Sequence, residues 1–210
     1  MRKNITHDIY FFKQVFFPGF MDQHEWDVYF LTRAFENALK SPDLSTQNGA
    51  LVVNERFLIP SWLPWKYNVL GEACNTFPQG VRITNERLTK RPDKYDFTGH
   101  AEENSIVNAR NRGYFDLHGA ILYGTWVACG PCGRDIVNAG IKEVVDWKGV
   151  EKMIQETSRG EGMPDWQVSI NNAFEMFEDA GIIYRRVECH IPIDAEILFS
   201  GKKFNIGKII

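Results

Sequence analysis

Apolar residues follow a helical spacing in an early segment of the chain, residues 25–40 (EWDVYFLTRAFENALK). The apolar positions that fit this spacing are Trp26, Tyr29, Phe30, Ala34 and Ala38. A spacing of three to four residues is typical of an amphipathic helix. Pro42 lies just beyond the segment, where it would stop a helix. The pattern therefore predicts a first helix over residues 25–40.

Two short apolar runs rich in β-branched residues come next, GALVV at 49–53 and RFLIPSWL at 56–63. Only Asn54 and Glu55 separate them, a spacing that predicts a β-hairpin. Residues 64–99 contain three prolines and show no sustained periodicity, so we expect a long irregular connection there. A connection of this length is usually functional or partly helical.

From residue 100 onward, helical and strand patterns alternate. The predicted helices are 100–113, 131–140 and 165–181, and the predicted strands are 119–126, 141–147 and 182–188. Gly113 and Gly140 occupy positions typical of helix C-caps. Alternation of this kind predicts an α/β fold, a three-layer α/β/α sandwich with a mixed, largely parallel sheet entered by an antiparallel hairpin. We expect a single domain over 1–210, with an N-terminal extension of about 24 residues and a C-terminal tail after about residue 190.

Composition and charge narrow the possible partners. The 210 residues are 44% hydrophobic and carry a formal net charge of -3, which opposes a surface-wide affinity for nucleic acid or anionic membranes but leaves a local basic patch open. The chain has no apolar run of membrane-spanning length, and polar residues interrupt its first apolar segment, so neither a transmembrane helix nor a signal peptide is predicted. Four cysteines in a chain of this length do not form a disulfide scaffold, which favours a reducing cytoplasm.

The segment VACGPCGRD (127–135) contains a C-x-x-C motif, Cys129 and Cys132, that supports two interpretations. A helix beginning at Pro131 would lower the pKa of the first thiol, as in a redox dithiol. The same geometry would hold two thiolates on a metal ion. His100, at the start of the preceding predicted helix, would add an imidazole at the same edge of the sheet. Three protein ligands leave a tetrahedral Zn²⁺ one open position, as in catalytic zinc sites.

These motifs resemble those of the zinc-dependent deoxycytidylate (dCMP) deaminase family, within the cytidine deaminase superfamily, whose signature is H-x-E followed by P-C-x-x-C. The similar segments are STQNGALVV, ACNTFPQGV, HAEENSIVNARNRG, LYGTWVACGPC and NAGIKEVV, in the order expected for the family. Ala128 stands where the family has a proline before the first cysteine. The resemblance implies a cytidine deaminase-like fold and Zn²⁺ as cofactor.

The resemblance also implies roles for particular residues. It makes His100, Cys129 and Cys132 the zinc ligands and Glu102 the general acid and base. Geometry alone left Glu103 as a competitor, because residues two apart in a regular helix lie on nearly opposite faces.

Further residues are candidates for substrate binding. Asn75 matches the family's loop asparagine and is a candidate for the sugar hydroxyl; the alternative is an asparagine that only forms a turn. Trp126 is a candidate wall of the base pocket or an ordinary core residue. Arg87 and Arg91 belong to a basic run, 82–95, that is either a solvated face or a phosphate-binding segment.

The predicted function is hydrolytic deamination of a cytosine deoxynucleotide, dCMP to dUMP plus ammonia, by zinc-activated water. Alternatives within this chemistry are a deaminase of dCTP or of a base in nucleic acid, the latter disfavoured by the acidic charge balance. Alternatives from other classes are a thiol-disulfide protein using Cys129 and Cys132 and a non-catalytic module stabilised by zinc. The expected partner is a small nucleotide, with no membrane partner, and the resemblance implies a homo-oligomer.

Overall fold

Helix α2 (Gln23–Ala38) confirms the first predicted helix in the structure, a computed structural model that describes residues 21–55, 67–157 and 166–209. A reciprocal capping box begins it. Asp22 Oδ1 accepts a hydrogen bond from Glu25 N at 2.8 Å, and Glu25 Oε2 accepts one from Asp22 N at 3.2 Å. These bonds satisfy backbone donors that the first turn leaves without partners, so the start of the helix is fixed locally.

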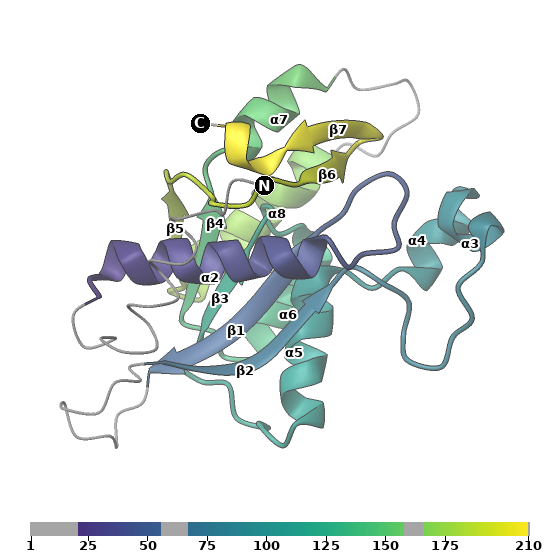
Figure 1. Cartoon of the computed structure of the whole chain (residues 1–210). Coiled ribbons are helices and arrows are strands. Elements are labelled where there is room, and N and C mark those ends of the chain that lie inside the picture. The colour runs from purple at the N-terminus through teal and green to yellow at the C-terminus, as the bar shows by residue number, and fades with distance from the viewer. Residues whose placement is uncertain (1–20, 56–66, 158–165, 210) are drawn as a thin grey trace.

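The central sheet has five strands in the order β2-β1-β3-β4-β5 (Figure 1). They are β2 (Tyr67–Cys74), β1 (Gly49–Glu55), β3 (Ile121–Gly124), β4 (Glu143–Trp147) and β5 (Ile183–Val187). β1 is antiparallel to both of its neighbours, whereas β3, β4 and β5 pair in parallel. β1 therefore runs against the other four strands, and the expected mixed sheet is confirmed.

The second strand of the predicted hairpin was wrongly placed. The run at 56–63 lies outside the described residues, and β1 pairs instead with β2, inside the stretch 64–99 that we expected to be irregular. The sequence pattern does not predict β2, because Gly71 and Glu72 interrupt its apolar residues. Glu72 is accommodated because it accepts hydrogen bonds from Arg33 of α2 at 2.7 and 2.9 Å.

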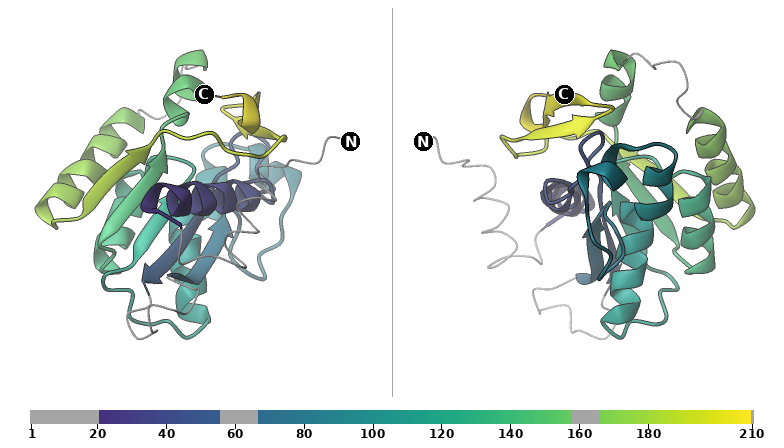
Figure 2. Two further views of the ribbon diagram at one scale, coloured as in Figure 1. Left: turned by 60° about the vertical axis from the view of Figure 1, so that its left-hand side comes forward. Right: turned by 90° about the vertical axis from the view of Figure 1, so that its right-hand side faces the viewer.

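Helices cover both faces of the sheet, as the two views of Figure 2 show. α2 packs on one face. The other face carries α5 (Ala101–Asn111), α6 (Gly130–Asn138) and α8 (Trp166–Asp179). Strand β1 divides its side chains between the layers, because Leu51 and Val53 join the core under α2 while Val52 joins the core under the other helices. The three-layer α/β/α fold and the helices predicted after residue 100 are thus confirmed.

Shorter elements occupy the remaining segments. Two short helices, α3 (Asn85–Thr89) and α4 (Asp93–Phe97), lie in the connection before α5, and α7 (Val150–Glu156) follows β4. The segment after about residue 190, expected as a tail, contains the hairpin β6 (Glu196–Phe199) and β7 (Lys202–Asn205) and the 3-10 turn η2 (Ile206–Lys208). Several of its apolar side chains are buried in the α2 core, among them Ile197, Phe204 and Ile206. Within the ranges given above, no helix combines the length and apolarity needed to cross a bilayer.

Gly71 lets α5 lie directly against the sheet. A Cβ atom at this position would be 2.2 Å from the Ser105 carbonyl oxygen and 2.5 Å from the Ala109 backbone nitrogen, both in α5. Because these are backbone atoms, no side-chain rotation relieves the overlap. Any residue larger than glycine must therefore push α5 away from β2.

We expect Gly71→Ala to lower the free energy of unfolding by about 1–3 kcal/mol or more, the usual range for overpacking a core. Urea denaturation followed by circular dichroism measures it. Val81→Ala, at an exposed position outside the sheet, is the control and should stay within about 0.5 kcal/mol of the unmodified chain. An unchanged midpoint in Gly71→Ala would show that the helix does not approach the strand as described.

Candidate metal centre

Several elements bring their ends to one edge of the sheet. β1 begins there at Gly49, which pairs with Cys74 at the end of β2, and Ala50 pairs with Gly124 at the end of β3. Helices α5 and α6 begin at the same edge, with His100 and Cys129 as their N-caps. The carboxyl ends of parallel strands are the usual place for sites in open α/β sheets.

The cap positions resolve the spacing problem raised by His100 and Glu102. His100 has extended backbone angles (φ -74°, ψ 159°) and lies just outside the regular helix, which begins at Ala101. A residue two positions further along is therefore not forced to the opposite face. Cys129 is also extended (φ -85°, ψ 172°), and Pro131 occupies the first turn of α6, where its missing N–H is not needed.

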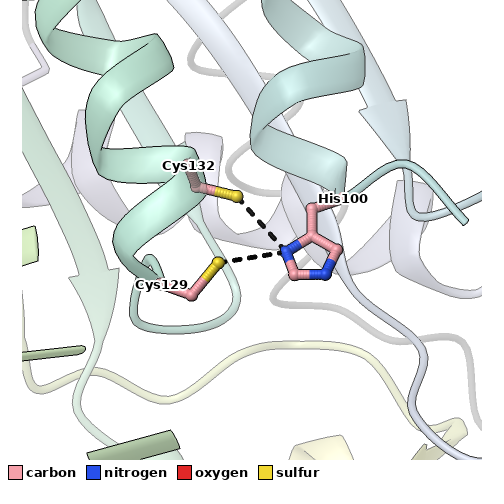
Figure 3. A group of neighbouring side chains, drawn as sticks. All are labelled: His100, Cys129 and Cys132. Atoms are coloured by element: carbon pink, nitrogen blue, oxygen red, sulfur yellow. Dashed lines mark hydrogen bonds between the residues drawn. The ribbon is translucent and has the colours of Figure 1, made fainter. Parts of the chain in front are cut away.

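Three side chains converge at this edge, His100, Cys129 and Cys132 (Figure 3). His100 Nδ1 lies 3.3 Å from Cys129 Sγ and 3.3 Å from Cys132 Sγ. Zinc bonds of about 2.0 Å to nitrogen and 2.3 Å to sulfur at a tetrahedral angle would separate these atoms by about 3.5 Å. One imidazole and two thiols at these distances fit a metal ion, and the group can hold one.

The three side chains of the group also share their protons. The pKa of the Cys129 thiol is lowered to about 4, first because the Cys132 thiol hydrogen-bonds to it and then because His100 does. The hydrogen bond with Cys129 raises the pKa of His100 to about 9. The pKa of Cys132 is raised, because it shares a hydrogen bond with the Cys129 sulfur and is buried. Cys129 therefore favours the thiolate form that binds a metal, whereas His100 and Cys132 must each lose a proton when a metal binds.

The structure separates the two neighbouring glutamates. Glu102 is 2% exposed, with Oε2 lying 3.7 Å from Cys132 Sγ, whereas Glu103 lies on the exposed side of α5. Burial raises the pKa of the Glu102 carboxyl. A carboxyl group with a raised pKa beside a metal-binding group suits proton transfer. Geometry therefore supports Glu102 over Glu103 in that role.

Asn75 is buried, and its side chain has partners within the protein. Its Oδ1 accepts a hydrogen bond from Asn48 N at 2.7 Å, and its Nδ2 donates to the Thr46 carbonyl at 2.8 Å and to Asp43 Oδ2 at 3.4 Å. These contacts brace the loop 41–48 that leads into β1. The contact to a sugar hydroxyl stays a prediction.

Trp126 is partly buried and packs against the C-terminal hairpin. Its ring stacks on Phe199 of β6, with centroids 3.6 Å apart. This contact is the one expected of an ordinary core residue. Its place in a base pocket stays a prediction.

The two candidate arginines differ in their surroundings. Arg87 lies over the Phe97 ring at 4.5 Å and donates a hydrogen bond to the Arg82 carbonyl. Arg91 is exposed, 6.0 Å from the centre of the Tyr95 ring. Lys94, from the same basic run, is buried in an ion pair with Asp43 at 2.7 Å, so it serves the fold.

The first turn of α8 adds two residues that the sequence pattern did not single out. Ser169 Oγ accepts a hydrogen bond from Gly130 N at 2.9 Å and so restrains the turn between the two cysteines. The Trp166 ring, 37% exposed, lies 6.2 Å from the His100 ring and 6.3 Å from the Tyr95 ring. No motif marks these residues, because they reach the site through tertiary packing, including that of α8 on α6.

Comparison with known proteins agrees with this geometry. The model of the MafB19-like deaminase family matches residues 64–172, slightly more than half of the chain. The chain belongs to this deaminase family. The match includes His100, Glu102 and both cysteines of the candidate centre, and it disfavours the thiol-disulfide alternative.

Relatives of this MafB19-like deaminase include the deoxycytidylate deaminases of Mus musculus and Homo sapiens, at 36% and 35% identity over 124 residues. The matched segment is 59% of this chain, and it spans 65% of the length of either relative. ComE operon protein 2 of Bacillus subtilis is 27% identical over 171 residues, 80% of this chain and 74% of that protein. The resemblance to deoxycytidylate deaminases is thus confirmed.

A solved structure shares the fold. The dCMP deaminase of cyanophage S-TIM5, in complex with dCMP and dUMP, superposes with a TM-score of 0.55 at 18% identity, covering 80% of this chain and 99% of the phage protein. The two proteins therefore share the cytidine deaminase-like fold although their sequence identity is low.

We expect the purified protein to bind about one metal ion per chain, because one three-residue group is seen among the described residues. Cys132→Ser should abolish most of this binding, since it removes a ligand. Cys189→Ser, at a partly buried cysteine outside the group, should keep it. Elemental analysis by mass spectrometry after desalting measures both. Equal metal content in the two variants would contradict the assignment.

Proposed function

We propose that the protein is a zinc-dependent hydrolase that converts dCMP to dUMP and ammonia. The observation that carries the proposal is the convergence of His100, Cys129 and Cys132 beside the buried carboxyl of Glu102, in a chain that belongs to a deaminase family. The similarity to deoxycytidylate deaminases supports dCMP as the substrate.

His100, Cys129 and Cys132 would hold the zinc ion. When bound, zinc acts as a Lewis acid that lowers the pKa of a coordinated water toward about 7. Two thiolates neutralise the ion's charge, so a neighbouring base is needed for water activation. The contact between Glu102 Oε2 and Cys132 Sγ, at 3.7 Å, supports Glu102 as this base.

Glu102 moves protons during the reaction. Its carboxylate accepts a proton from the attacking water and delivers it to N3 of the pyrimidine while oxygen adds to C4. It then transfers the second proton of that water to the amine, which leaves as ammonia. Burial raises the pKa of the Glu102 carboxyl group. This supports both transfers, because a group that accepts and donates a proton works best when its pKa lies near the operating pH.

Substrate class is settled by assaying ammonia release from dCMP, dCTP, deoxycytidine and a short cytosine oligonucleotide in parallel. We expect dCMP to give the highest kcat/KM. Preference for dCTP or for the oligonucleotide would move the protein to another branch of the superfamily. A protein that holds zinc but releases ammonia from none of them would contradict the proposed function.

Glu102→Gln should lower kcat on dCMP by about 10²–10⁴-fold, the usual contribution of general acid-base catalysis, because an amide cannot carry the proton. Zinc content and melting temperature should stay close to those of the unmodified protein. Glu103→Gln is the matched control, since its side chain is exposed on the same turn, and should be close to fully active. Reversal of the two effects would overturn the assignment of roles.

The basic run is proposed to recognise the 5′-phosphate. Arg91→Glu should raise KM for dCMP about tenfold or more, because a charge-assisted hydrogen bond is lost, and leave turnover of deoxycytidine nearly unchanged. Arg87→Glu should act in the same direction. Arg110→Glu, at an exposed position in α5, is the control for altered net charge. Equal kcat/KM for dCMP and deoxycytidine in the unmodified protein would remove the phosphate argument.

The proposal extends to Asn75 as a sugar contact, to Trp126 as part of the base pocket and to the whole chain as a single deaminase domain. It also includes a cytoplasmic location, which the few cysteines favour, and a homo-oligomeric state, which the family resemblance supports. Light scattering of the purified protein measures the latter.

A further inference from the structure

Asn48 lies at the start of β1 with its side-chain amide facing the carboxyl group of Glu102. Asn48 Nδ2 donates to Glu102 Oε2 at 3.5 Å. The terminal torsion of a glutamate is broad, so a buried carboxylate needs a donor to hold its two oxygens in one orientation. Asn48 is placed to supply that donor.

The backbone of Asn48 is fixed from two sides. Its N–H donates to Asn75 Oδ1 at 2.7 Å, and its carbonyl accepts from Asn75 N at 3.0 Å. The next residue, Gly49, exchanges hydrogen bonds with Thr125. Gly49 N donates to Thr125 Oγ1 at 3.1 Å, and Thr125 N donates to the Gly49 carbonyl at 3.0 Å. The start of β1 is therefore held at the site edge by the ends of both neighbouring strands.

Thr125 also sets the orientation of the Asn48 amide. Its Oγ1 donates to Asn48 Oδ1 at 2.5 Å. The opposite orientation would turn the amide oxygen toward Glu102, and two acceptors would then face each other. The hydroxyl thus directs Nδ2, the donating end, at the carboxylate.

We propose that Asn48 is a positioning residue that orients the Glu102 carboxylate for proton transfer, and that Thr125 acts through Asn48. The inference rests on the proposed function for its kinetic consequences, while the contacts that carry it are independent of the substrate. A positioned base contributes to the transition state more than to substrate binding, so its loss lowers kcat.

The kinetic test uses zinc-loaded protein with dCMP. Asn48→Leu removes the amide at similar volume and should lower kcat by about 10- to 100-fold, the range for groups that orient side chains at metal sites. KM, zinc content and melting temperature should change little. Thr125→Val should lower kcat in the same direction, and Thr125→Ser, which keeps the hydroxyl, should restore it. In a Glu102→Gln background, Asn48→Leu should cause no further loss.

Three kinetic results would overturn the inference. The first is an unchanged kcat in both Asn48→Leu and Thr125→Val. The second is an effect confined to KM, which would make Asn48 a substrate contact. The third is a further loss of kcat when Asn48→Leu is added to Glu102→Gln. The Thr125 pair keeps the test valid if Asn48→Leu does not fold.

A spectroscopic arm separates failure of this inference from failure of the proposed function. The ¹³C carboxyl resonance of Glu102, identified by its loss in Glu102→Gln, is recorded at constant pH in zinc-loaded protein without substrate. Thr125→Val should shift it, because the hydrogen bonds among the described residues connect Thr125 to Glu102 through Asn48. Thr125→Ser should not shift it. An unshifted resonance in Thr125→Val overturns the inference even if dCMP is turned over. A shifted resonance supports it even if dCMP is not the substrate.

Discussion

The close contact between helix α5 and strand β2 is the constraint on which the candidate site depends. α5 presents His100 at its N-cap and Glu102 in its first turn, and its distance from the sheet is set where its backbone meets Gly71. The thiols come from a different helix, α6, that follows a different strand. Since imidazole and thiols must meet within one coordination sphere, small changes in the α5 position would separate the ligands. A glycine buried under the helix therefore governs chemistry at its end.

Much of the fold and the chemical core of the site could be predicted from the sequence, because their signals are local. The helices after residue 100 carry apolar periodicity and end at glycines such as Gly140, which has a positive φ of 75°. The metal-binding candidates stand at short, recognisable spacings, and the family resemblance selected Glu102 as the proton carrier. Spacing alone left Glu102 and Glu103 in competition, because the cap conformation of His100 depends on how the helix begins.

What sequence reasoning missed depends on partners distant in the chain. A charged residue such as Glu72 argues against a strand in the sequence. In the structure it pairs with Arg33, which lies 39 positions away in the chain. Lys94, in the basic run, reads as a group available to a ligand, yet the fold pairs it with Asp43. A buried polar group must be paired, and the sequence does not say whether the pair is a ligand or another part of the protein.

The loop 41–48 also receives contacts from the C-terminal hairpin. Gln47 Oε1 accepts a hydrogen bond from Leu198 N, 151 positions later, and Ser45 accepts one from Gly201. By contrast, His100 and Cys132 are only 32 positions apart. Because a nascent chain emerges from the ribosome N-terminus first, the histidine and both cysteines are available long before that loop can gain these contacts. The β6–β7 hairpin can therefore contact the loop that leads to Asn48 only after the residues of the metal-binding group have been synthesised.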